Sequence, residues 1–196
     1  MKKLFGIIQF SKLLQDFSKI ERVILKRGEN KWENDSEHSY GLTMLAWYIM
    51  ETDKIKLKKD LVLKYALAHD LVEVYAGDTY FFSTDENHET KKFAREKKAA
   101  ERLKKEFPGF KELHSSIKKY EERNDPESRF VYALDKVIPM LNIYTDNGRT
   151  WKKKNVTIKM LVDKKKDKVA LSPAIEKYFW ELIKILKKEK ARLFNK

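Results

Sequence analysis

The stretch Tyr65-Ala66-Leu67-Ala68-His69-Asp70-Leu71-Val72-Glu73-Val74-Tyr75-Ala76-Gly77-Asp78 decides how this chain folds. It begins as an apolar run of helix-favouring residues, and then carries an imidazole, two carboxylates, a glycine and a third carboxylate. Burying so many ionisable groups costs free energy unless a metal ion or a set of partners compensates. We therefore expect this segment to serve a chemical site.

The composition of the whole chain favours helices. Its 196 residues include only 6 glycines and 4 prolines, too few for a loop-rich all-β fold. Apolar residues recur at steps of three and four, while the alternating pattern of strands is absent. No repeat or linker interrupts the sequence. We expect a single all-α domain over residues 1–196.

Apolar spacing and capping residues place the expected helices. Asp35 or Ser36 suits the N-cap of the second helix, and Gly77 suits the end of the third, which Asp60 can cap. Pro139 lies inside a later helix and should kink or divide it. The expected helices cover about 7–25, 35–50, 61–76, 89–107, short pieces up to 122, 126–147, 156–166 and 173–194.

Charge and cysteine content restrict the function. The chain has no cysteine, which excludes disulfides, thiolate nucleophiles and cysteine-type zinc sites. Its formal net charge is +13, but lysine runs such as 152–154 and 164–166 lie among carboxylates at helical spacing, and we interpret them as solvated surface. No nucleic-acid motif accompanies the charge, so nucleic acid is an unlikely partner. A basic helical nucleic-acid-binding protein remains the non-enzyme alternative.

The N-terminal residues do not indicate export. Met1 to Ile8 begin like a signal peptide, but Gln9, Ser11 and Lys12 interrupt the pattern and no small-residue cleavage site follows. No run approaches the roughly 18 apolar residues that a membrane-spanning helix needs. We expect a cytoplasmic protein without a membrane partner.

A set of histidines and carboxylates supplies candidate metal ligands. Glu73 follows His69 by four positions and Asp70 by three, which places it on their face of a helix. His38 and Asp135 are the further candidates. Two histidines and two aspartates suit a divalent ion that accepts nitrogen and oxygen ligands, such as Mn²⁺, Co²⁺, Fe²⁺, Ni²⁺ or Zn²⁺. Taken singly, each residue is more consistent with a structural role, so the hypothesis depends on their combination.

This combination resembles the HD-domain phosphohydrolases. The H…HD…D pattern of that superfamily falls on His38, His69, Asp70 and Asp135. A Glu-Asn-x-x-Glu-His lead-in precedes the first histidine, and Glu73 and Gly77-Asp78 follow the pair. The resemblance covers about residues 10–150. Within the superfamily it points to the branch of the bacterial 5′-deoxynucleotidases and related HD-domain-containing proteins.

The resemblance implies a helix bundle of the HD type with one central divalent metal ion. Its metal-site core would span about 10–150, with C-terminal helices at about 156–194. It further implies a homodimer that releases phosphate from (deoxy)nucleoside 5′-monophosphates. An HD-type phosphodiesterase or nucleoside triphosphate hydrolase would use the same ligands, so both remain alternatives.

The resemblance also assigns roles around the metal. In the deoxynucleotidase branch, the residues that match Glu73 and Asp78 belong to the active site: Glu73 suits proton transfer, and Asp78 could position water or substrate hydroxyls. The Arg-Trp pair that helps that branch hold its substrate is here Arg22-Val23. Arg22 or Arg27 could therefore bind the phosphate, and this departure leaves the substrate open.

Overall fold

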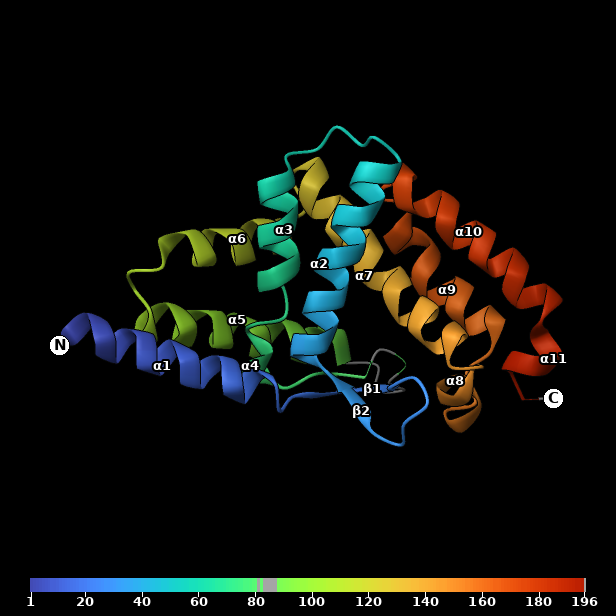
Figure 1. Cartoon of the computed structure of the whole chain (residues 1–196), viewed down its shortest axis with the longest axis horizontal. Coiled ribbons are helices and arrows are strands. Elements are labelled where there is room, and N and C mark those ends of the chain that lie inside the picture. Colours follow the sequence, from blue (N-terminus) through green and yellow to red (C-terminus); the bar gives the residue numbers. More distant parts are fainter. Residues whose placement is uncertain (81, 83–87, 196) are drawn as a thin grey trace.

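The computed structural model describes residues 1–80, 82 and 88–195, and this part of the chain is helical apart from one two-stranded sheet (Figure 1). The expected all-α class is confirmed. The helices are α1 (Lys2–Phe17), α2 (Asp35–Thr52), α3 (Lys59–Ala68), α4 (Glu73–Ala76), α5 (His88–Glu106), α6 (Lys111–Glu122), α7 (Pro126–Thr145), α8 (Arg149–Lys153), α9 (Ile158–Val169), α10 (Pro173–Lys188) and α11 (Lys190–Leu193). No helix among the described residues is long and apolar enough to cross a membrane.

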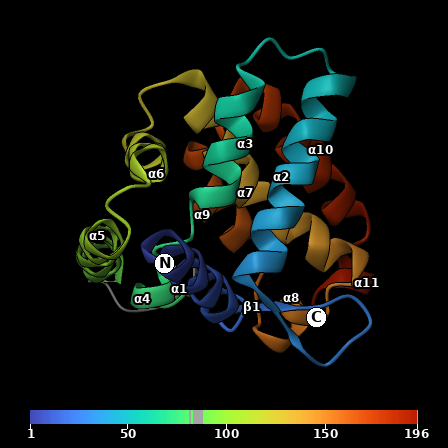
Figure 2. The same cartoon turned by 60° about the vertical axis from the view of Figure 1, so that its left-hand side comes forward.

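Helices α2, α3 and α7 form the centre of the molecule. Helix α2 packs against α3 and α7, and α7 also packs against α9 and α10, which lie on its other side (Figures 1 and 2). Their buried side chains make one apolar cluster, to which α2 contributes Leu42, α3 contributes Tyr65 and α7 contributes Leu134. The central part of α7 is thus enclosed by helices from both halves of the chain.

A second apolar cluster lies beside the first. It joins Leu13 and Phe17 of α1 to side chains of α5 and α6, and it includes Ala68, Leu71 and Val72. The segment 65–72 therefore begins in one cluster and ends in the other. His69 and Asp70 lie at this junction, which is how the stretch with the unusual charges organises the fold.

The expected helix over residues 7–25 is wrong at its C-terminal end. Helix α1 ends at Phe17, and Glu21–Leu25 form strand β1, which pairs antiparallel with β2 (Trp32–Asn34). The glycine of the intervening turn, Gly28, has φ +73°, a conformation that glycine adopts without steric cost. Val23 and Ile24 continue the helical spacing by coincidence, although such β-branched residues also favour strands.

The expected helix over residues 61–76 is interrupted at the site itself. Helix α3 begins after Lys58, not after Asp60, and ends at Ala68. Residues 69–72 form tight turns, in which Leu71 N–H donates to the Ala68 carbonyl and Glu73 N–H donates to the Asp70 carbonyl. The short helix α4 then ends at Gly77 as expected, with φ +73°. The ionisable residues therefore occupy a helix break.

Other boundaries also depart from the expectation. Asn34, not Asp35 or Ser36, is the N-cap of α2. Helix α7 continues through Pro139 from Pro126 to Thr145 and is not divided. Helix α8 was not expected, and the last expected helix is divided into α10 and α11.

Candidate metal centre

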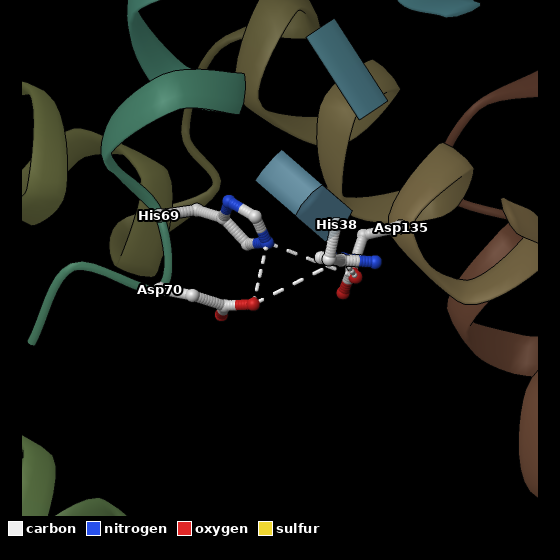
Figure 3. Close-up of side chains that lie close together, drawn as sticks. All are labelled: His38, His69, Asp70 and Asp135. Atoms are coloured by element: carbon white, nitrogen blue, oxygen red, sulfur yellow. Dashed lines mark hydrogen bonds and ion pairs between the residues drawn. The ribbon is translucent and has the colours of Figure 1, made fainter. Parts of the chain in front are cut away.

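Three central helices bring the four predicted ligands together. His38 lies in the first turn of α2, His69 and Asp70 follow α3, and Asp135 lies in α7. Their side chains point toward one another (Figure 3). One ligand atom from each lies within 4.8 Å of the others, and His38, His69 and Asp135 are buried. Residues distant in sequence thus converge on one point.

The ligand atoms are close enough to share an ion. His38 Nε2 lies 2.9 Å from Asp135 Oδ1, and His69 Nε2 lies 2.9 Å from Asp70 Oδ2. The crossed distances are 3.9 Å from His38 Nε2 to Asp70 Oδ2 and 3.8 Å from His69 Nε2 to Asp135 Oδ1. The Nε2 atom of each histidine therefore faces the carboxylates of both Asp70 and Asp135.

The hydrogen bonding of His69 shows that these residues fit a metal ion. Its Nδ1 lies 3.0 Å from the Ala66 carbonyl oxygen, which can only accept, so Nδ1 is the donor. Nε2 is therefore the nitrogen that faces the carboxylate oxygens of Asp70 and Asp135. Only a cation, either a proton on Nε2 or a metal ion, can lie between this nitrogen and those oxygens. Two imidazoles and two carboxylates suit a divalent transition metal ion.

The charges of the site are consistent with this fit. Burial opposes a charge on His69, but the Asp70 carboxylate outweighs it and raises the His69 pKa to about 10. For His38, burial and then the Arg22 charge lower the pKa to about 4. One imidazole is thus already neutral, and the other holds a proton that a metal ion would replace.

Arg22 reaches the site because residues 21–25 form a strand. Its Nη1 donates to Asp70 Oδ2 at 2.7 Å and to Asp35 Oδ1 at 3.0 Å. The side chain is 13% exposed, so it borders the cavity beside the ligands without lying in open solvent. Arg27, by contrast, is exposed in the turn after β1 and does not line this cavity. Of the two predicted arginines, the structure brings only Arg22 to the site.

Glu73 and Asp78 lie next to the ligands. With Asp35 they form a second group whose carboxylate oxygens lie within 4.8 Å of one another. Burial, followed by the charge of Asp70, raises the pKa of Glu73 well above its ordinary value. Lys92 Nζ lies 3.3 Å from Glu73 Oε1, whereas Oε2 is buried without a hydrogen-bond partner. Glu73 therefore can hold a proton at the edge of the cavity.

Sequence reasoning missed a carboxylate behind His38. Glu33 lies in β2, where Asn142 Nδ2 donates to its Oε1 at 2.8 Å. Its other oxygen, Oε2, lies 3.8 Å from His38 Nδ1. This distance is too long for a hydrogen bond, and both atoms are buried without a hydrogen-bond partner, so Glu33 lies behind the ring without bonding to it. The Glu-Asn-x-x-Glu-His spacing contained this residue, but only the β1–β2 pairing shows its position.

Cationic side chains on the cavity wall were missed as well. The cavity has a volume of about 110 Å³ and lies between β1, α7, α8 and α9. Lys136 follows a ligand directly, and its Nζ lies 2.5 Å from Asp135 Oδ2. Lys92 and Lys165 come from α5 and α9. Because lysine is common throughout this sequence, composition could not distinguish these lysines from surface ones.

The stretch of chain that contains the four candidate ligands matches a known protein family. The HD domain family model matches residues 16–176, which include all four candidate ligands. The chain belongs to the HD domain family. In this HD domain, the motif histidines and aspartates are those that converge in Figure 3. The family resemblance that the sequence indicates is therefore confirmed, as is the expectation of a divalent metal ion.

Among proteins of known name, the chain is similar to 5′-deoxynucleotidases. The HD domain is 31% identical over 133 residues to 5′-deoxynucleotidase HDDC2 from Xenopus laevis and 29% identical over 133 residues to that of Mus musculus. Each alignment covers 66% of this chain, but only 64% of the relative. The chain thus matches less than two thirds of the length of these proteins.

Solved structures show the same fold. A predicted metal-dependent phosphohydrolase from Magnetospirillum magnetotacticum is 28% identical, with a TM-score of 0.83 over 100% of both chains. An HD-domain phosphohydrolase from Listeria innocua is 19% identical, with a TM-score of 0.61 over 93% of this chain and 86% of that one. The second likeness concerns the HD fold alone.

Proposed function

We propose that this HD domain protein is a metal-dependent phosphomonoesterase that releases inorganic phosphate from (deoxy)nucleoside 5′-monophosphates. One observation supports it above all: the four ligands converge beside a cavity, which Asp70 and Asp135 line together with Arg22 and the buried acid Glu73. This arrangement combines a metal site, a cation for a phosphoryl group and a proton donor. The 5′-deoxynucleotidase relatives support the choice of substrate.

The metal ion has a defined task in this proposal. Held by His38, His69, Asp70 and Asp135, it would supply Lewis-acid polarisation of a phosphoryl oxygen and a lowered pKa for water. The protein supplies the remaining groups. Arg22 binds the phosphoryl oxygens and neutralises the charge that develops on them.

Proton transfer falls to the carboxylates beside the ligands. A water molecule forms the new bond to phosphorus and loses one proton to solvent. As the bond between phosphorus and the 5′-oxygen breaks, Glu73 donates its proton to that oxygen, and the nucleoside leaves as a neutral alcohol. Asp78 borders the same cavity and accepts hydrogen bonds from water or a sugar hydroxyl. These roles require a Glu73 that is protonated near neutral pH, which its burial favours.

The size of the cavity fits a phosphoryl group better than a whole nucleotide. At about 110 Å³ it is smaller than the roughly 300–1,000 Å³ of pockets that enclose drug-sized ligands. Tyr80 and Phe82 also line it, with ring centroids 5.9 Å apart. In this proposal the phosphate enters the cavity, while these rings contact the sugar or the base.

A substrate panel tests this function. Purified protein loaded with Mn²⁺ or Co²⁺ is incubated with deoxynucleoside and ribonucleoside monophosphates, nucleoside triphosphates and cyclic dinucleotides. We expect inorganic phosphate from the monophosphates, and none from a folded Asp70→Asn control. Pyrophosphate from triphosphates, or linear products from cyclic dinucleotides, without monophosphate turnover would reject the proposal in favour of the alternative HD reactions.

A further inference from the structure

Helix α2 contains an uncharged segment in a highly charged protein. Residues 38–50 include no lysine, arginine, aspartate or glutamate, although 37% of the whole chain is of these four types. The inner side of this segment is buried in the apolar core through Leu42, Ala46 and Met50. The other side of α2 faces solvent and lies at the front of the molecule in Figure 2. A helix that is apolar on all sides is normally buried on all sides, so the exposed side of α2 needs an explanation.

The exposed side of α2 presents aromatic rings and a methionine. Tyr40, Met44, Trp47 and Tyr48 are between 44% and 67% exposed. Because positions 40, 44, 47 and 48 recur at helical spacing, these side chains form one stripe along about two turns. We call this stripe the outer face of α2. Tyrosine, tryptophan and methionine are the residues that the buried centres of protein interfaces favour, and charged residues are depleted there.

The outer face of α2 is large enough for the centre of an interface. An aromatic side chain can bury roughly 150–250 Å², and Tyr40, Trp47 and Tyr48 each expose nearly half of their surface or more. Together with Met44 they offer a few hundred Å² of apolar surface, the size that marks interaction sites on soluble proteins. A stable contact buries about 800 Å² on each partner, so neighbouring polar residues would complete it as a rim.

The absence of charge indicates which partner fits the outer face of α2. Nucleic acids and anionic membrane surfaces are bound by lysine and arginine side chains, and residues 38–50 contain neither. When two identical copies meet about a twofold axis, a charged residue near the axis meets the same charge on the other copy. An uncharged face avoids this repulsion, whereas a contact with a different protein could use complementary charges.

The charges that border the outer face compensate each other. Lys59 of α3 has its Nζ 5.8 Å from the centroid of the Trp47 ring, and it forms an ion pair with Glu51 at the end of the stripe. The net charge of +13 thus arises elsewhere on the protein. Salt screens charges at such separations, because the Debye length is about 8 Å at physiological ionic strength.

Helix α1 also exposes apolar side chains, but in a different setting. Leu4, Phe5 and Ile8 are exposed, and exposed lysines at positions 2, 3 and 12 lie among them. Two copies that met through this helix would bring like charges together. The outer face of α2 therefore fits a twofold contact better than α1 does.

We propose that the outer face of α2 is the contact between two copies of this chain, in which α2 packs against the same helix of the partner about a twofold axis. Trp47 and Tyr48 carry most of the binding energy, because tryptophan and tyrosine dominate such contacts. Helix α2 begins with the candidate ligand His38. The second copy thus holds this helix from its outer side, while α3 and α7 hold it from within.

The test is the oligomeric state of the purified chain, measured by sedimentation equilibrium. We expect the wild type to be a dimer in the micromolar range. Trp47→Glu removes a large ring and introduces a buried charge twice in each dimer, so the dimer dissociation constant should rise by about a hundredfold or more. Tyr48→Glu should act in the same way, and it keeps the test valid if Trp47→Glu does not fold.

Trp180→Glu is the matched control for Trp47→Glu. Trp180 is likewise partly exposed, at 39%, but it lies in α10, which packs on α7. This variant should dimerise like the wild type. The wild-type dimer should also persist in high salt, because screening weakens the repulsion between two positively charged copies and leaves an apolar contact intact.

Four results would overturn the inference. The first is a wild type that stays monomeric throughout the micromolar range, and the second is a dimer that high salt dissociates, which would indicate a contact through charges. The third is wild-type dimerisation in folded Trp47→Glu and Tyr48→Glu. The fourth is an equal loss of dimer in Trp180→Glu, which would show that the effect is not specific to the outer face of α2.

Discussion

The helix that precedes His69 orients its ring for a ligand role. The Ala66 carbonyl accepts from Nδ1, which directs Nε2 toward Asp70 and Asp135. A ring held in this way loses little conformational freedom when it binds an ion. The residue is therefore organised for a ligand role by backbone atoms that no side-chain substitution removes.

We predict that His69→Ala and Asp70→Ala each abolish metal retention and turnover while the helical circular dichroism persists. The reason is that each removes one of four ligands but no large apolar contact. Metal content after purification is the measurement. His114→Ala is the control, because its imidazole contacts the Phe107 carbonyl away from the site. Full metal content in a folded Asp70→Ala protein would contradict the assignment.

We predict that Glu73→Gln retains the metal and lowers kcat by about 10²–10⁴-fold, the usual contribution of a general acid. KM should change little, because the amide preserves the shape of the side chain without supplying the proton. Steady-state kinetics on a deoxynucleoside monophosphate, with metal analysis in parallel, checks both parts. A normal kcat in this variant would show that Glu73 is not the general acid.

Lys165 should make stability depend on pH. Its folded-state pKa of about 7 lies below the ordinary 10.5, so its contribution is most favourable above 10.5 and is lost as the pH falls through 7. We predict that Lys165→Gln raises Tm by several degrees at pH 6 without phosphate, and by less at pH 9. Thermal melts at both values measure this. A gain that is equal at both pH values would contradict it.

At the scale of elements, helix breaks and a short strand build the site. The H…HD…D spacing indicated the ligands, because motif residues are recognised by type and order. The strand β1 could not be predicted in this way. Val23 and Ile24 continue the apolar spacing of the preceding helix, and a strand of five residues is too short to give a clear alternating pattern. Its pairing with β2 is a tertiary contact, and that contact positions Arg22 and Glu33.

The N-terminus of α2 holds His38 in place through a capping box. Asn34 Oδ1 accepts from Glu37 N–H at 3.0 Å, and Glu37 Oε2 accepts from Asn34 N–H at 3.0 Å. We predict that Asn34→Ala destabilises the protein by about 1 kcal/mol, or roughly 2–4 °C in Tm. Ser172→Ala is the control, since that N-cap makes no side-chain capping bond. Equal effects of the two substitutions would contradict the capping role.

At the scale of the whole molecule, one ion would connect α2, α3 and α7 where the two apolar clusters meet. The stretch 65–78 indicated chemistry because its charges follow an apolar run. The cationic wall of the cavity was beyond sequence reasoning. Lys165 is like its neighbours in sequence and differs only in burial, which the packing of α9 on α7 decides.

Metal binding should therefore stabilise the whole fold. An ion at 100 times its dissociation constant stabilises the native state by about 2.7 kcal/mol, or roughly 5–10 °C for a domain of this size. We predict that chelation lowers Tm by this amount and that Mn²⁺ or Co²⁺ restores it. The Asp70→Ala variant should show no such response. A wild-type Tm that is insensitive to chelation would contradict a central metal.

The most direct test of the account is phosphate release from deoxynucleoside 5′-monophosphates by the same wild-type preparation before chelation, after chelation and after addition of Mn²⁺ or Co²⁺. We expect turnover to disappear when the metal is removed and to return when it is added. Undiminished turnover in the chelated protein, or no turnover with any metal on any monophosphate, would contradict it.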